Sequence, residues 1–92
     1  MTGGLESKLA EIIADRAGVQ VDEVSDDVDV LAGLGMDSLA FLDAAYDIDR
    51  AFGITLPVDQ WMERVNSGDA QLSDYFLFRN LVGHVAALAN GH

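Results

Sequence analysis

The hydrophobic and polar positions follow a helical period in four stretches of the chain. Residues 4–17, 38–52, 57–68 and 73–89 each place apolar side chains every three or four positions, the spacing of an amphipathic helix. Gly18, Gly53, Gly68 and Asn90-Gly91 stand at their ends, and glycine commonly terminates helices. The pattern therefore predicts a small all-α bundle of four helices.

Each predicted helix has an apolar stripe that we expect to face the core. The first stripe consists of Leu5, Leu9, Ile12 and Ile13, with Arg16 on the same side. In the second helix the stripe is Leu39, Leu42, Ala45, Tyr46, Ile48 and Phe52, with the aspartates outward. The third helix carries Val58, Trp61, Met62 and Val65, and the last carries Leu77, Leu81, Val85 and Leu88.

Residues 19–36 lack this period and are rich in aspartate and glycine. The segment nevertheless keeps regularly placed aliphatic side chains, so we expect an ordered loop that packs on the core. These side chains are Val21, Val24, Val28, Val30, Leu31 and Leu34. A calcium loop opening at Asp27 is excluded, because Leu31, Ala32 and Ser38 occupy positions that require a ligand, a glycine and a glutamate.

Residues 54–57, Ile-Thr-Leu-Pro, are predicted to be extended, since a residue before proline avoids the helical region. We expect Pro57 in the first turn of the third helix. His84 lies one position before the stripe of the last helix. We interpret it as a packing or surface residue, because a lone histidine is rarely a ligand or a base.

The composition excludes several classes of function. The 92 residues suit one domain, residues 1–92, with a single core and no deep, walled active site. A net charge of −11 opposes binding to nucleic acid or to an anionic membrane surface. The absence of cysteine excludes disulfides and zinc–thiolate sites, and no membrane-length apolar run or leader sequence is present. We expect a soluble, cytoplasmic monomer that is not an enzyme, with no catalytic or metal-binding residues and no stable membrane insertion.

The acidic residues surround one short segment. No lysine or arginine occurs between Arg16 and Arg50, whereas nine carboxylates do. Asp43 and Asp47 are four positions apart on one helix, and such like-charged pairs repel each other by about 0.2–0.5 kcal/mol. Docking of basic partners would explain this face, and a merely solvating acidic surface is the alternative.

The segment at the centre of this acidity is Leu34-Gly35-Met36-Asp37-Ser38-Leu39. Asp37 and Ser38 both favour a helix start, but only one of them is needed as the cap. If Asp37 caps the helix, the Ser38 hydroxyl points outward beside the free amides, a setting that suits a phosphate ester. Gly35 allows a sharp turn before the helix. A plain cap with no chemistry remains the alternative, whereas a hydrolase elbow is excluded because Met36 and Ala40 replace its glycines.

The segment VSDDVDVLAGLGMDSL, together with the acidic helix and the ITLP that follow, resembles the acyl carrier proteins over nearly the whole chain. The resemblance implies a four-helix acyl-carrier-type bundle with a long first loop. It also implies that a separate phosphopantetheinyl transferase attaches 4′-phosphopantetheine from coenzyme A to Ser38. Acyl chains would then be carried as thioesters on the arm's thiol, which fits a chain that has no thiol of its own.

The same resemblance suggests roles for the neighbouring residues. Asp37 would position the serine and help the transferase hold a metal, and Leu39 would anchor the start of the helix. Asp43, Asp47 and Asp49, with Leu39, would meet basic patches on enzymes that load, elongate and transfer acyl chains in fatty acid or lipid A biosynthesis.

Residues 58–78 differ from the short form of the family. The insertion WMERVNSGDAQLSDYFLF and the following RNL are similar to the specialised carriers of very long fatty acids for lipid A. They imply an extra helical segment before the last helix. A peptidyl, aminoacyl or polyketide carrier is an alternative, and so is an unmodified acidic interaction module in which Ser38 is only a cap.

Overall fold

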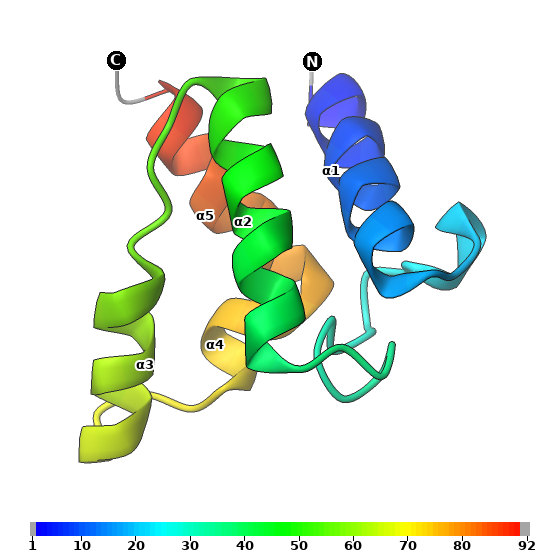
Figure 1. Ribbon diagram of the computed structural model, residues 1–92. Coiled ribbons are helices and arrows are strands. Elements are labelled where there is room, and N and C mark those ends of the chain that lie inside the picture. The colour runs from blue at the N-terminus through cyan, green and yellow to red at the C-terminus, as the bar shows by residue number, and fades with distance from the viewer. Residues whose placement is uncertain (1, 91–92) are drawn as a thin grey trace.

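The computed structural model describes residues 2–90 (Figure 1). Its elements are α1 (Thr2–Ala17), the short 3₁₀ helix η1 (Val21–Glu23), α2 (Ser38–Phe52), α3 (Val58–Ser67), α4 (Ser73–Phe76) and α5 (Phe78–Asn90). Within the described residues there is no strand beyond an isolated bridge between Asp29 and Leu77. The all-α prediction is therefore confirmed, including the additional helical segment before the last helix.

The helices pack around one apolar core. α1 and α2 lie side by side and run in opposite directions, α5 lies behind α2, and α3 stands apart from α1 on the far side of α2 (Figure 1). Leu9 and Ile13 of α1, Ile48 of α2, and Leu81 and Val85 of α5 are fully buried in this core. Within residues 2–90, no helix is long and apolar enough to cross a membrane.

The orientation of α2 differs from the prediction. Its buried stripe is Phe41, Ala44, Ala45 and Ile48, whereas Leu39, Leu42 and Tyr46 are 73%, 46% and 60% exposed. Both stripes follow a helical period, so periodicity alone could not decide which one faces the core. The buried stripe contains two alanines, and small residues let neighbouring helices approach α2 closely. The prediction that Leu39 anchors the helix start is wrong.

The single helix expected over residues 73–89 is also wrong, because the chain breaks at Leu77. This residue is extended, with φ −68° and ψ 129°. The break lets Phe76 and Phe78, which flank it, both enter the core. The carbonyl of Phe76 accepts a hydrogen bond from Val30 N–H, and Phe78 N–H donates to the carbonyl of Val28, both at 2.8 Å.

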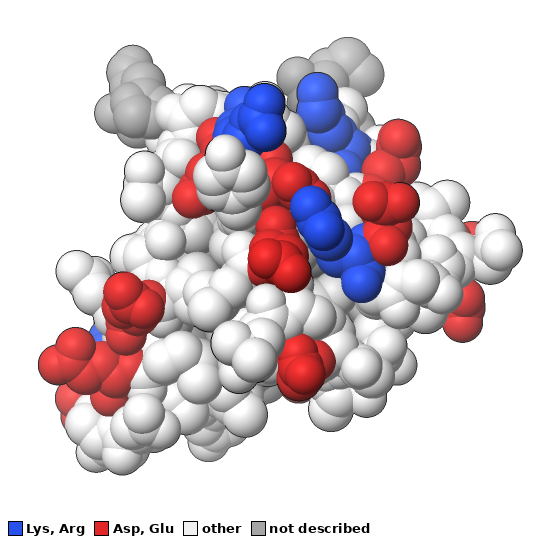
Figure 2. All heavy atoms as spheres, viewed as in Figure 1, with Lys and Arg blue, Asp and Glu red and all other residues white. Residues whose placement is uncertain are grey.

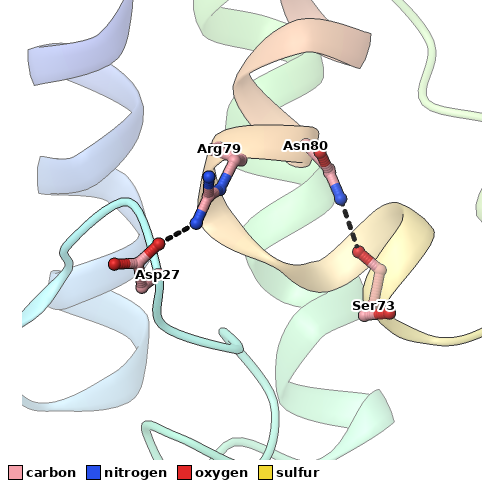
Figure 3. A network of polar contacts seen from close by, with 4 residues as sticks. All are labelled: Asp27, Ser73, Arg79 and Asn80. Carbon is pink, nitrogen blue, oxygen red and sulfur yellow. Dashed lines mark hydrogen bonds and ion pairs between the residues drawn. The ribbon is translucent and has the colours of Figure 1, made fainter.

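These two bonds attach the long loop to the junction of α4 and α5. Arg79 forms an ion pair with Asp27 across the same junction, and Asn80 Nδ2 donates to the carbonyl of Ser73 at 2.9 Å (Figure 3). The loop is ordered, as predicted, and Val24 and Val30 are buried in the core. Val21 is the exception among the expected anchors, since it lies on η1 and is 48% exposed.

The connection from α2 to α3 is extended, as expected. Leu56 N–H donates to Asp49 Oδ1 at 2.8 Å, and Ile54 N–H donates to the carbonyl of the same aspartate at 3.1 Å. Pro57 precedes the first turn of α3 instead of lying within it, and its carbonyl accepts the first helical bond from Trp61 N–H at 3.0 Å. The segment before α3 is thus fixed to the second half of α2.

α3 is held to the bundle by aromatic contacts. Trp61 is buried and stacks on Tyr75 of α4, with ring centroids 4.8 Å apart and planes at 9°. The ring of His84 on α5 lies 5.2 Å from Trp61 and 5.3 Å from Tyr75, and its Nε2 is 3.1 Å from the carbonyl oxygen of Asp74. His84 is therefore a packing residue, which agrees with its interpretation as a packing or surface residue.

Candidate functional site

The site is built around the first turn of α2. Gly35 adopts a left-handed conformation with φ +68°, which turns the chain toward the helix start. Met36 is buried, and its N–H donates to the carbonyl of Leu31 at 2.8 Å. Asp37 then caps the helix, because its Oδ1 accepts a hydrogen bond from Ala40 N–H at 2.7 Å. Of the two candidate caps, the structure selects Asp37, and Ser38 is free of that task.

Ser38 is exposed and is the first residue of α2. Among the described residues, its hydroxyl has no hydrogen-bond partner, and the amides of Ser38 and Leu39 have no acceptor. A phosphate group joined to the hydroxyl would lie beside these two donors and at the positive end of the helix dipole. The residues present therefore fit a phosphodiester at this serine.

An apolar cavity of about 160 Å³ opens beside Ser38. Its lining comes from the long loop, the first half of α2, the first turns of α3, and α4. Phe41 and Phe76, which both line it, meet edge to face with ring centroids 4.9 Å apart, and Trp61 lies 6.0 Å from Phe76. Phe41 and Phe76 are buried and well packed, with Trp61 behind them, so the part of the wall that these two rings form is rigid.

The three aspartates expected to meet partners have different surroundings. Asp47 forms an ion pair with Arg16 of α1 at 2.6 Å, and this hydrogen bond lowers the pKa of its carboxyl group. Asp49 is partly buried and accepts the Leu56 amide described above. Asp43 is exposed and, among the described residues, makes no hydrogen bond or ion pair. Only Asp43 therefore presents a carboxylate with no internal partner.

Figure 2 shows acidic and basic side chains close together where α1 and α2 lie side by side. Arg16 is one cause of this mixture, since it offsets part of the repulsion expected between Asp43 and Asp47. Docking of a basic partner is thus not the only explanation for the paired aspartates.

The exposed apolar stripe of α2 was not predicted from the sequence. Leu39, Leu42 and Tyr46 lie on one side of the helix, beginning next to Ser38. The guanidinium of Arg50 sits over the Tyr46 ring, 5.6 Å from its centroid. The signal was present, because α2 contains more apolar residues than one buried stripe can use. Together with Asp43, these residues give the surface around Ser38 both apolar and acidic character.

No group of three or more histidine, cysteine or carboxylate side chains is placed to bind a metal ion within the part of the chain described. Several carboxylates accept capping or backbone hydrogen bonds, Asp47 and Asp27 form ion pairs, and Asp69 accepts a hydrogen bond from the Ser67 hydroxyl. The chemistry that the arrangement supports is attachment of a group to the one exposed hydroxyl at the start of α2.

Comparison with known proteins agrees with this geometry. Residues 7–75 match the family described as "Phosphopantetheine attachment site". The chain is 41% identical to the acyl carrier protein AcpXL of Mesorhizobium japonicum and 38% identical to that of Brucella melitensis, with 88% of this chain and 87% of each relative covered. It is also 34% identical to part of the citrinin polyketide synthase of Monascus ruber, covering 96% of this chain and 4% of the synthase. The chain thus belongs to the phosphopantetheine-attachment family of acyl carrier proteins, which carry acyl chains on a covalently bound 4′-phosphopantetheine arm.

Proposed function

We propose that Ser38 is the attachment point of the 4′-phosphopantetheine arm and that the chain, residues 1–92, acts in the cytoplasm as a non-catalytic carrier domain. One observation carries this assignment. Ser38 is exposed at the first turn of α2, relieved of capping by Asp37, and lies at the edge of an apolar cavity. A serine needed only as a cap would hold its hydroxyl on the amides of its own helix.

The arm supplies a thiol on which an acyl chain is held as a thioester. The protein's residues then have three tasks: Ser38 holds the phosphodiester, the amides of Ser38 and Leu39 donate to it, and the cavity shelters apolar carbons. Each methylene removed from water favours the sheltered state by about 0.8 kcal/mol. This free energy is a reason for an acyl chain to fold back against the protein.

The surface next to Ser38 is the proposed docking site for partner enzymes. These would be a phosphopantetheinyl transferase and enzymes that load, elongate or transfer acyl chains. Asp43 offers an unpaired carboxylate to a basic patch, and exposed Leu39 offers an apolar contact. Asp47 and Asp49 would contribute less, because Arg16 and the Leu56 amide already engage them. Charge-steered contacts form quickly and depend on salt, which suits a carrier that visits several enzymes.

The specialised lipid A role is proposed from the relatives named AcpXL. They match this chain over most of their own length, and the similar region extends through the α3 and α4 segments that distinguish it from shorter carriers. We propose that the cargo is a very long acyl chain used in lipid A biosynthesis. The match to the polyketide synthase covers a small part of that protein and keeps a polyketide carrier as the second candidate.

The test of attachment is intact-mass spectrometry after incubation with coenzyme A and a phosphopantetheinyl transferase. We expect the wild-type chain to gain the mass of one arm and Ser38→Ala to gain none. Ser73→Ala is the matched control, because Ser73 is also an exposed serine that begins a helix, and this variant should load like wild type. Failure of the wild type to gain mass, or loading of Ser38→Ala, would contradict the assignment.

The acyl group itself separates the candidate cargoes. A carrier purified from its native host and analysed by mass spectrometry should bear a very long acyl chain. A polyketide intermediate, an aminoacyl group or a peptidyl group on the arm would support the alternatives. A chain that functions in its host with Ser38 unmodified would instead be an acidic interaction module.

A further inference from the structure

Two hollows along α2 share part of their walls. The first is the cavity beside Ser38, and the second, of about 400 Å³, lies between the middle of α2 and residues 55–60. Three residues line both of them: Leu42, Val58 and Asp59. These residues therefore stand where one hollow meets the other. The two hollows form a groove that starts at Ser38 and follows α2 toward Asp49.

The first hollow is too small for a long chain. An apolar cavity of about 150 Å³ accepts a molecule the size of benzene, so a cavity of about 160 Å³ holds roughly six carbons. The second hollow is more than twice as large and is lined mainly by apolar groups, among them Ala45, Leu56 and Pro57. A chain that enters the first hollow and is much longer than six carbons must extend into the second.

The two sides of the junction between the hollows differ in rigidity. Val58 is held in place, because its N–H donates to the carbonyl of Leu56 at 2.9 Å, and Leu56 is buried and bonded to Asp49. Leu42, on the opposite side, is 46% exposed and has space to change its side-chain rotamer. The passage between the hollows thus has one fixed wall and one movable wall.

We propose that Leu42 and Val58 form a gate that determines how long an acyl chain the protein can shelter. This inference depends on the proposed function at Ser38. The first hollow opens beside Ser38, so the acyl chain enters there and reaches the second hollow afterwards. A chain that reaches from either hollow into the other must pass between Leu42 and Val58. Short chains remain in the first hollow, and long chains displace the Leu42 side chain to reach the second.

The experiment measures thermal stability as a function of chain length. Wild type, Leu42→Phe and Leu42→Ala are loaded with saturated acyl arms of about 4, 8, 12 and 16 carbons, and each Tm is compared with that of the same variant carrying the bare arm. No partner enzyme is present during the melting measurement, so effects on docking do not enter.

The gate predicts three different curves. In wild type the rise in Tm continues beyond the length that fills the first hollow. In Leu42→Phe, whose larger ring blocks the passage, the rise stops at about six carbons. The longest chain is then less stabilising than in wild type by at least about 3–6 °C, the shift that sheltering a single methylene produces. In Leu42→Ala the long chains stabilise at least as much as in wild type. Val58→Ala should behave as Leu42→Ala does, because it opens the gate from the other side.

Leu72→Phe is the matched control. Leu72 is 42% exposed, similar to Leu42, and lines neither hollow. Its curve of Tm against acyl chain length should coincide with that of wild type. Curves for Leu42→Phe and wild type that coincide at every length would overturn the gate while leaving attachment at Ser38 intact. A wild-type chain that cannot be loaded would refute the proposed function instead.

Discussion

Asp37 caps α2 through its Oδ1, and this leaves the hydroxyl of Ser38 without a structural partner among the described residues. The two adjacent residues thus differ in what their removal costs. Asp37 satisfies an amide that has no partner within the helix, and Ser38 satisfies none. Asp37 therefore stabilises the helix start, and the neighbouring Ser38 is left available for modification.

This difference gives a direct prediction. Asp37→Ala should lower the free energy of unfolding by about 0.5–2 kcal/mol, the usual cost of losing a cap. Ser38→Ala should change it by no more than about 0.5 kcal/mol, as is typical of an exposed position without such a role. Urea denaturation of the unmodified chains measures both values. A loss at Ser38 as large as that at Asp37 would mean that the serine is itself part of the cap.

For single residues, the sequence predicts the features that depend on residues nearby in the chain. It identified Asp37 and Ser38 as the two candidate caps of the helix and predicted the turn at Gly35. The roles of Asp47 and Asp49 could not be predicted, because their partners, Arg16 and the Leu56 amide, come from other parts of the chain. Their assignment as docking residues rested on charge alone.

Between elements, the contact of α1 with α2 includes the ion pair of Arg16 with Asp47. The hydrogen bond from Arg16 lowers the pKa of Asp47 in the folded protein. The pair's contribution to stability is therefore present above the pKa of an unfolded aspartate, about 3.9, and is lost as the pH falls through the lowered value.

Asp47→Asn should remove this pH-dependent contribution. The difference in unfolding free energy between wild type and Asp47→Asn should be constant near neutral pH and should shrink in acid. Denaturation at a series of pH values measures it, with Asp22→Asn, an exposed site on η1, as the control. A difference that grows as the pH falls would have the wrong sign for this pair.

The break between α4 and α5 makes a second prediction about elements. The amides of Val30 and Phe78 donate across the junction between the loop and the helices. They should exchange with solvent deuterium much more slowly than a typical loop amide, even though Val30 lies outside any helix. Hydrogen exchange followed by NMR reports each amide. Rapid exchange at Val30 would show that the loop does not stay attached there.

Element boundaries show what helical periodicity can and cannot predict. All four stretches that it predicted to be helical are helical in the structure. It gave the wrong inward face for part of α2, because two different sets of apolar residues on that helix have the same spacing. It also missed the break at Leu77, because three consecutive apolar residues, Phe76 to Phe78, fit a buried helix as well as an extended kink. Only the pairing with residues 28–30, distant in sequence, selects the kink.

The whole molecule carries a net charge of −11, and its charged residues are distributed unevenly. A positively charged partner surface would be steered toward it, and this steering weakens as salt shortens the range of the interaction. The all-α fold and the absence of protein thiols could be inferred from sequence, as could the family. The groove could not, because it is formed by α2, α3, α4 and the loop together.

Loading by the transferase should therefore depend on ionic strength. We expect KM for the carrier to rise with salt, and Asp43→Asn to raise KM at low salt while leaving kcat nearly unchanged. Asp22→Asn serves as the control, because it removes the same charge from an exposed site away from α2. Equal effects of the two variants would indicate a general influence of net charge and no specific contact at Asp43.

The most direct test of the carrier function is peptide mass spectrometry of the protein isolated from its own cells. We expect phosphopantetheine, with or without an acyl chain, on the peptide that contains Ser38 and on no other peptide. Ser38 found unmodified under all growth conditions, or an arm attached to a different residue, would contradict it.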